Sequence, residues 1–197
     1  LITFMTAGSY AVACQIDATS WTDPTPSLVQ VSPAEAADIE TVVTPTELTA
    51  GDTAMVTCHG TDAMGNPITE GWEVAVIPES SAGLEVDDFT LTAITVGSYE
   101  VACRESGGAQ DSTPVEISVA HGLPYKLVTE LESDIIEAGD QTTVTCRAED
   151  AQGNLVPDFV FSLAPLSHVV FAGQDVTSTV AGTYVVKCVP GDLGEWS

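Results

Sequence analysis

The residues of this chain that could support catalysis or bind a transition metal are three histidines and five cysteines. His59, His121 and His168 are scattered, and no Ser/His/Asp set, HExxH or CxxC pattern accompanies them. His59 follows a cysteine in a motif whose second copy has Arg147 at that place. Arginine cannot replace a metal ligand or a general base, so we predict that the chain is not an enzyme.

Carboxylates are the other possible metal ligands, because Ca²⁺ binds through oxygen. One cluster contains Glu130, Glu132, Asp134 and Glu137, of which the first three share a face if the segment is a strand. The sequence has no EF-hand or nonapeptide calcium pattern. Weak binding of Ca²⁺ and a plain solvated strand edge both explain the cluster, and no other cofactor is expected.

The composition describes a folded and strongly acidic protein. Its net charge is −25, from 29 acidic and 4 basic residues, which excludes binding to nucleic acid and to anionic membranes. Because 44% of the residues are hydrophobic and only 17% are charged, disorder is not expected. Such a surface suits high salt or seawater, where self-repulsion is screened. No apolar run approaches membrane-spanning length, and a start at Leu1 without a signal peptide suggests a processed or excerpted chain.

The segments that must position these residues occur more than once in the sequence. Residues 50–66 (AGDTAMVTCHGTDAMGN) and 138–154 (AGDQTTVTCRAEDAQGN) agree at 10 of 17 positions. A second motif, Gly-[Ser/Thr]-Tyr-x-Val-x-Cys, occurs at 8–14, 97–103 and 182–188. Both motifs recur at about 87 residues, so the chain is a tandem array. We expect a first, incomplete repeat at 1–32, a complete middle repeat at 33–120, and a third repeat at 121–197 that lacks its last strand.

Each motif alternates as a β-strand does. Tyr99, Val101 and Cys103 fall on one face, while Glu100 falls on the other. The Asp-Ala-x-Gly-Asn segments supply turn residues. Short strands between Gly, Pro and Asp, without a helical period, predict all-β immunoglobulin-like sandwiches arranged in tandem. Expected strands are 1–4, 8–15 and 26–31; then 38–43, 53–60, 72–77, 82–86, 89–95, 97–104 and 113–119; then 126–132, 141–149, 158–163, 168–171, 174–179 and 182–189.

The cysteines follow the repeat. Cys58 is expected to pair with Cys103, and Cys146 with Cys188, each pair joining the second strand of a sandwich to the sixth. Cys14 is the sixth-strand cysteine of the first repeat, so its partner is expected outside the sequence. Disulfides would place the chain in an oxidising compartment, which is the cell surface, the periplasm or the extracellular medium. Buried free thiols, which behave as small hydrophobic side chains, are the alternative.

The string AGDxxxVTCxxxDAxGN, followed later by AGTYVVKC, resembles the immunoglobulin-like repeats of the invasin/intimin type of bacterial adhesin. Filamin-type repeats are a more distant likeness. The resemblance covers essentially the whole chain and implies a surface protein whose repeats act as spacer, stalk or fibre. Internal repeats of that adhesin group commonly lack this regular cysteine pair, so the resemblance implies the sandwich fold but not membership of an exact subfamily.

The expected function is therefore structural: a non-catalytic repeat segment of a stalk, fibre or filament on a bacterial surface, whose partners are neighbouring copies or repeats. One alternative is an adhesin module that binds a host or cell-surface ligand through loops at one end of the sandwich. Another is a pilus-like subunit that donates residues 26–31 as a strand to a neighbour. Trp21 and Trp196, at equivalent points in two repeats, either pack between domains or subunits or cover the ends of their own domains.

Overall fold

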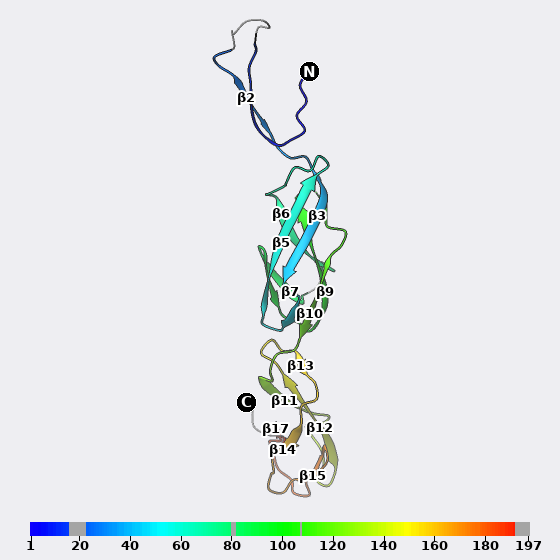
Figure 1. Cartoon of the computed structure of the whole chain (residues 1–197). Helices are drawn as coiled ribbons and strands as arrows, with labels where there is room; N and C mark the ends of the chain where they lie inside the picture. The colour runs from blue at the N-terminus through cyan, green and yellow to red at the C-terminus, as the bar shows by residue number, and fades with distance from the viewer. Residues whose placement is uncertain (16–22, 80–81, 107, 192–197) are drawn as a thin grey trace. The chain divides into compact units, whose positions relative to one another are not determined.

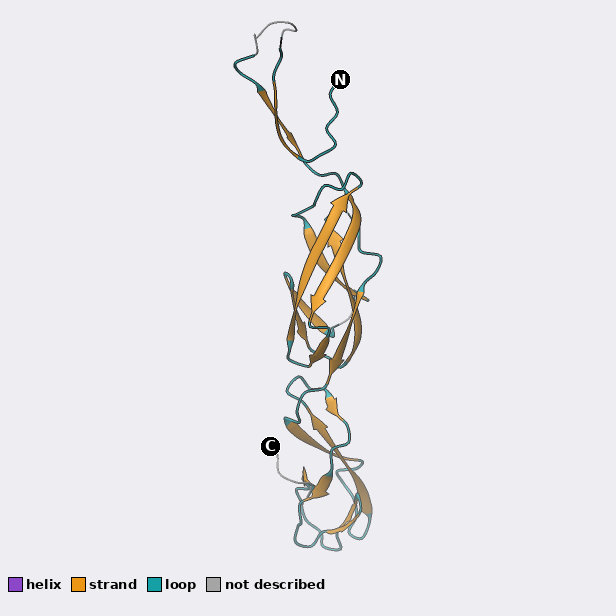
Figure 2. Ribbon diagram, in the orientation of Figure 1, coloured by secondary structure: helices purple, strands orange, loops and turns teal. Residues whose placement is uncertain are grey.

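The computed structural model describes residues 1–15, 23–79, 82–106 and 108–191. All regular secondary structure in these residues is β-strand, drawn as orange arrows in Figure 2. The predicted all-β fold is confirmed. Within the same residues, no helix is long and apolar enough to span a membrane.

The first repeat contributes a two-stranded antiparallel hairpin. Strand β1 (Gly8–Val12) pairs with β2 (Ser27–Val31), with Gly8 opposite Val31. The segment LITF (1–4), which was expected to be a strand, is not one. An extended segment counts as a strand only when another segment accepts its hydrogen bonds, and no described residues pair with it.

The middle repeat is a sandwich of two four-stranded sheets, ordered β3-β5-β8-β7 and β4-β10-β9-β6. Its strands are β3 (Ala36–Thr44), β4 (Glu47–Thr49), β5 (Thr53–Asp62), β6 (Trp72–Ile77), β7 (Leu84–Asp87), β8 (Thr90–Ala93), β9 (Gly97–Glu105) and β10 (Val115–Ala120). The long pair β3 and β5 lies side by side in Figure 1. Seven of the eight strands lie where the sequence predicts them; β4, with three residues, is too short to leave a periodic pattern.

Alternation along the strands builds the core of this sandwich. Ala54 and Val56 on β5 are buried while their neighbours are exposed, as the period of two requires. Leu91, Val101 and Ile117, from three different strands, are fully buried. The two inner faces therefore supply one continuous apolar layer between the sheets.

The third repeat has one larger sheet, ordered β11-β12-β16-β15 with β13 on β12, and a separate β14-β17 pair. The strands are β11 (Lys126–Leu131), β12 (Gln141–Glu149), β13 (Leu155–Val156), β14 (Phe161–Leu163), β15 (Val170–Ala172), β16 (Asp175–Thr177) and β17 (Cys188–Pro190). A small core forms around Val144, Val176 and Cys188.

The prediction of a strand at 182–189 is mostly wrong, because β17 begins only at Cys188. Its counterpart β9 has hydrogen-bonded neighbours on both sides, β6 and β10. Among the residues that the structure describes, β17 has β14 alone. Before Cys188, the Lys187 carbonyl accepts a hydrogen bond from the Ala164 amide at 3.0 Å, but residues 182–187 form no strand.

The chain packs as two compact units. Unit 1 comprises Leu1–Thr46, Thr53–Leu91 and Ser98–Ser118, and unit 2 comprises Glu47–Asp52, Thr92–Gly97 and Val119–Ser197. Two segments of the middle repeat, of which the first includes β4, therefore belong with the third repeat. The same division places the first repeat in one unit with most of the middle one, so packing and sequence repetition follow different boundaries.

Candidate functional site: disulfides, buried turns and an open pocket

A disulfide joins the two sheets of the middle repeat. Cys58 on β5 is bonded to Cys103 on β9, with the Cα atoms 5.7 Å apart and a sequence separation of 45. The amide of Cys103 also donates a hydrogen bond of 2.8 Å to the Thr41 hydroxyl on β3. One covalent bond and one polar bond thus hold β9 to the opposite sheet.

The third repeat has the same arrangement. Cys146 on β12 is bonded to Cys188 on β17, with the Cα atoms 5.9 Å apart and a sequence separation of 42. The Cys188 amide donates to the Thr129 hydroxyl at 3.0 Å. Cys14, in contrast, is an exposed free cysteine in the described part of the chain, and a partner outside the sequence stays a prediction.

The Asp-Ala-x-Gly-Asn segment of the middle repeat forms a buried turn. Asp62 and Asn66 are only 4% and 7% exposed. The Asp62 carboxylate accepts hydrogen bonds from the main-chain amides of Met64 and Asn66, both at 2.9 Å, and from the Asn66 side-chain amide. The hydrogen bond from the Asn66 side chain is the largest influence on the pKa of Asp62, which is lowered from 3.8 to about 2. The carboxylate is therefore held ionised although it is buried.

The third repeat builds the same turn with Asp150 and Asn154, which are 2% and 8% exposed. Asp150 accepts from the main-chain amides of Gln152 and Asn154 and from the Asn154 side chain. Burial raises the pKa of Asp150, but the hydrogen bonds donated by Gly122 and Asn154 outweigh it, and the pKa is lowered. The sequence identified these segments as turns, but gave no sign that their side chains are buried.

Of the four candidate calcium ligands, Glu130 forms an ion pair instead. Its carboxylate lies 2.7 Å from the guanidinium of Arg147, in an exposed ion pair. Glu132, Asp134 and Glu137 are exposed. Across the ranges that the structure describes, no three His, Cys, Asp or Glu residues form a group that could hold a metal ion. Trp21 and Trp196, predicted as contact residues, lie outside the described residues.

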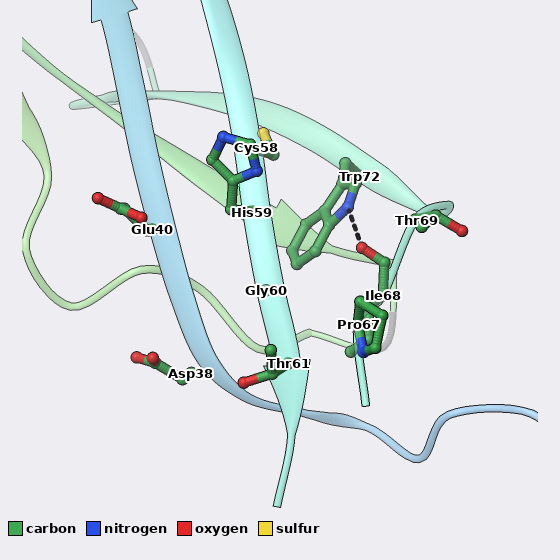
Figure 3. Close-up of a pocket in the computed structure, with 10 residues that line it drawn as sticks. All are labelled: Asp38, Glu40, Cys58, His59, Gly60, Thr61, Pro67, Ile68, Thr69 and Trp72. Atoms are coloured by element: carbon green, nitrogen blue, oxygen red, sulfur yellow. Dashed lines mark hydrogen bonds between the residues drawn. The ribbon is translucent and has the colours of Figure 1, made fainter. Parts of the chain in front are cut away.

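An open pocket lies on unit 1 beside Trp72, with a volume of about 510 Å³ (Figure 3). The Trp72 indole donates to the Ile68 carbonyl at 3.3 Å. A Cβ on Gly60 would stand 2.4 Å from this ring, so only glycine lets the indole lie against β5. Asp38 and Glu40 line the β3 side of the pocket. The sequence patterns pointed to no role for Trp72.

The fold defined by these sandwiches is that of the immunoglobulin-like domains of bacterial adhesins. No protein-family model and no curated protein sequence matches the chain. Among solved structures, it is similar to FdeC, an Escherichia coli adhesin, with a TM-score of 0.53 and 17% identity over 87% of this chain. Invasin, a bacterial integrin-binding protein, has a TM-score of 0.48 and 16% identity over 88% of the chain. InvD of Yersinia pseudotuberculosis has a TM-score of 0.48 and 14% identity over 97% of the chain.

The chain spans 65% of the FdeC structure, 40% of the invasin structure and 64% of the InvD structure. The resemblance read from the sequence motifs is thus confirmed for the fold. The activities of those longer proteins are not shared by virtue of the fold alone.

Proposed function

We propose that this chain is a structural, non-catalytic repeat segment of a stalk, fibre or filament on a bacterial surface. The observation that carries the proposal is that one disulfide-linked strand pair, with the same threonine hydrogen bond and the same buried turn, is built twice. Repetition of a complete structural device multiplies length and stiffness, whereas a catalytic site needs to be built once. The likeness to the fold of FdeC supports the surface location.

In this role each disulfide limits how far its repeat can extend under load. The chain from Cys58 to Cys103, a sequence separation of 45, would add about 150 Å of length if it were free, at roughly 3.3–3.6 Å per residue. The shorter loop of the third repeat would add about 140 Å on the same basis. An intact bond keeps this length out of the extended chain, so an unfolded repeat stays short.

Single-molecule force spectroscopy on the full chain, with and without reductant, tests the proposal. We expect two discrete unfolding events whose contour lengths increase in reductant by the two lengths given above. A Cys14→Ser variant serves as the starting protein, so that its exposed thiol forms no intermolecular bridge. Extension at low force without discrete events would contradict a mechanical role.

A second function, binding of a host or cell-surface ligand, is favoured by the pocket beside Trp72. Partly exposed aromatic residues are frequent in binding sites. The measurement is adhesion of beads coated with the chain to cultured animal cells. A loss with Trp72→Ala, but not with Tyr125→Ala at an exposed aromatic residue elsewhere, would support ligand binding. Equal adhesion of both variants would leave the structural role alone.

A further inference from the structure

Each of the two buried turns also makes hydrogen bonds to the preceding repeat, and in both turns the asparagine side-chain amide makes them. In unit 1, the Asn66 side chain accepts a hydrogen bond from the Ala7 amide at 2.7 Å and donates one to the Met5 carbonyl at 3.0 Å. Both partners belong to the first repeat, about 60 residues earlier in the sequence. The asparagine therefore satisfies one main-chain donor and one acceptor of another repeat at once.

In unit 2, Asn154 does the same to the middle repeat. It accepts from the Val96 amide at 3.1 Å and donates to the Ile94 carbonyl at 2.8 Å. Ile94 and Val96 stand three and one residues before Gly97, the first residue of a Gly-[Ser/Thr]-Tyr motif. Met5 and Ala7 stand at the same two distances before Gly8. The same contact is thus made at equivalent positions of the two repeats.

The aspartate of each turn reaches the segment that links two repeats. Asp62 accepts from the Ala34 amide at 3.0 Å, and Asp150 accepts from the Gly122 amide at 2.9 Å. The donor lies 28 residues before the aspartate in both cases. One turn therefore holds the loop of the preceding repeat with its asparagine and the linker with its aspartate.

We propose that the Asp-Ala-x-Gly-Asn turn is the docking element by which each repeat recognises the repeat before it. Its target is the main-chain carbonyl three residues before, and the main-chain amide one residue before, the glycine that opens the Gly-[Ser/Thr]-Tyr motif. Asparagine suits the contact because its side chain carries a donor and an acceptor together. Asn66 and Asn154 are only 7% and 8% exposed, so their side-chain groups would be costly to leave without partners, which makes the contact specific for a correctly seated neighbour. The inference rests on the tandem-repeat role proposed above and names the partner within it.

Amide hydrogen exchange on the full chain tests this assignment with two reciprocal variants. Asn154→Ala should speed exchange at Val96 by roughly tenfold or more, because the hydrogen bond that protects this amide is lost, and should leave Ala7 unchanged. Asn66→Ala should do the reverse. Each variant is the matched control for the other, and the amides of Cys103 and Val144 report whether the cores stay folded.

Unchanged protection of Val96 in the folded Asn154→Ala protein would overturn the proposal, as would equal acceleration at both sites in either variant. If an alanine variant does not fold, Asn154→Ser and Asn66→Ser, which keep a hydroxyl but shorten the reach, are measured in the same way. Failure here would not touch the mechanical role, because force spectroscopy on the unaltered chain decides that question separately.

Discussion

The side-chain amide of Asn154 lies 2.8 Å from the main-chain carbonyl of Ile94, although 60 positions of sequence separate the two residues. The only other asparagine in the protein, Asn66, makes the matching contact to Met5. Since both asparagines of the protein make this contact, we infer that the contact constrains the sequence. The predictions below test the turns, the cores and the acidic surface in turn.

Acid should weaken the turn of the middle repeat. The folded-state pKa of Asp62 is about 2, below its ordinary value of 3.8, so its contribution to stability is fully present above about pH 4 and is lost as the pH falls toward 2. Thermal melts between pH 5 and pH 2 should show this loss in the unaltered protein. The Asp62→Asn variant should have a lower melting temperature at pH 5 and a flatter dependence on pH. Parallel curves for the two proteins would contradict the role of the carboxylate.

Removing the disulfide of the middle repeat should cost about 4 kcal/mol of unfolding free energy in the chain-entropy model for a loop of this length. The measurement is urea denaturation of the Cys58→Ala, Cys103→Ala double variant, followed by tryptophan fluorescence. Cys14→Ser is the control, since its side chain is exposed, and its midpoint should not move. A double variant as stable as the parent would mean that the bond does not constrain the unfolded chain.

Leu91→Ala should destabilise the middle repeat by about 2–5 kcal/mol, because this fully buried side chain would leave a cavity between the sheets. Met55→Ala on the adjacent strand β5 is the matched control, since Met55 is exposed and its loss should change the free energy of unfolding by less than about 0.5 kcal/mol. If the two changes lowered the free energy of unfolding equally, Leu91 would not be a core residue of the middle repeat.

The melting temperature should rise with salt. At a net charge of −25, self-repulsion opposes folding, and the screening length falls from about 30 Å at 0.01 M salt to about 3 Å at 1 M. Melts in NaCl across this range measure the effect. Melts in CaCl₂ at matched ionic strength separate screening from binding: a larger rise with Ca²⁺ that disappears in Glu132→Gln would support the predicted calcium role of that cluster.

A duplication that keeps the register should create a new docking contact. Joining residues 106–197 after Pro190 gives the third repeat a copy of β10 and then a further repeat. The loop before Gly182 would present the Thr179 carbonyl and the Ala181 amide, at the distances that Ile94 and Val96 have from Gly97. Exchange at Ala181 should slow by roughly tenfold or more, and Asn154→Ala in the appended copy should reverse this. Fast exchange in both proteins would contradict the docking pattern.

The sequence predicted the strands of the middle repeat well because alternation and turn residues are local signals. It failed at residues 182–187, where strand formation depends on a hydrogen-bonded neighbour rather than on the pattern of the segment itself. It also missed the pocket beside Trp72, since the fit of the indole on Gly60 depends on strand packing. The docking role of Asn66 and Asn154 lay beyond reach for the same reason: their partners are about 60 residues away and show no side-chain signature.

The turns recognise only peptide groups of the neighbour, which every residue except proline can supply in full. A whole repeat could consequently be gained, lost or exchanged by recombination without a compensating change in the repeats beside it. Evolution could then adjust the number of repeats freely, while selection on each repeat's outer surface continued independently. Proline at the position of Val96 or Ala7 would be the substitution that this freedom does not allow.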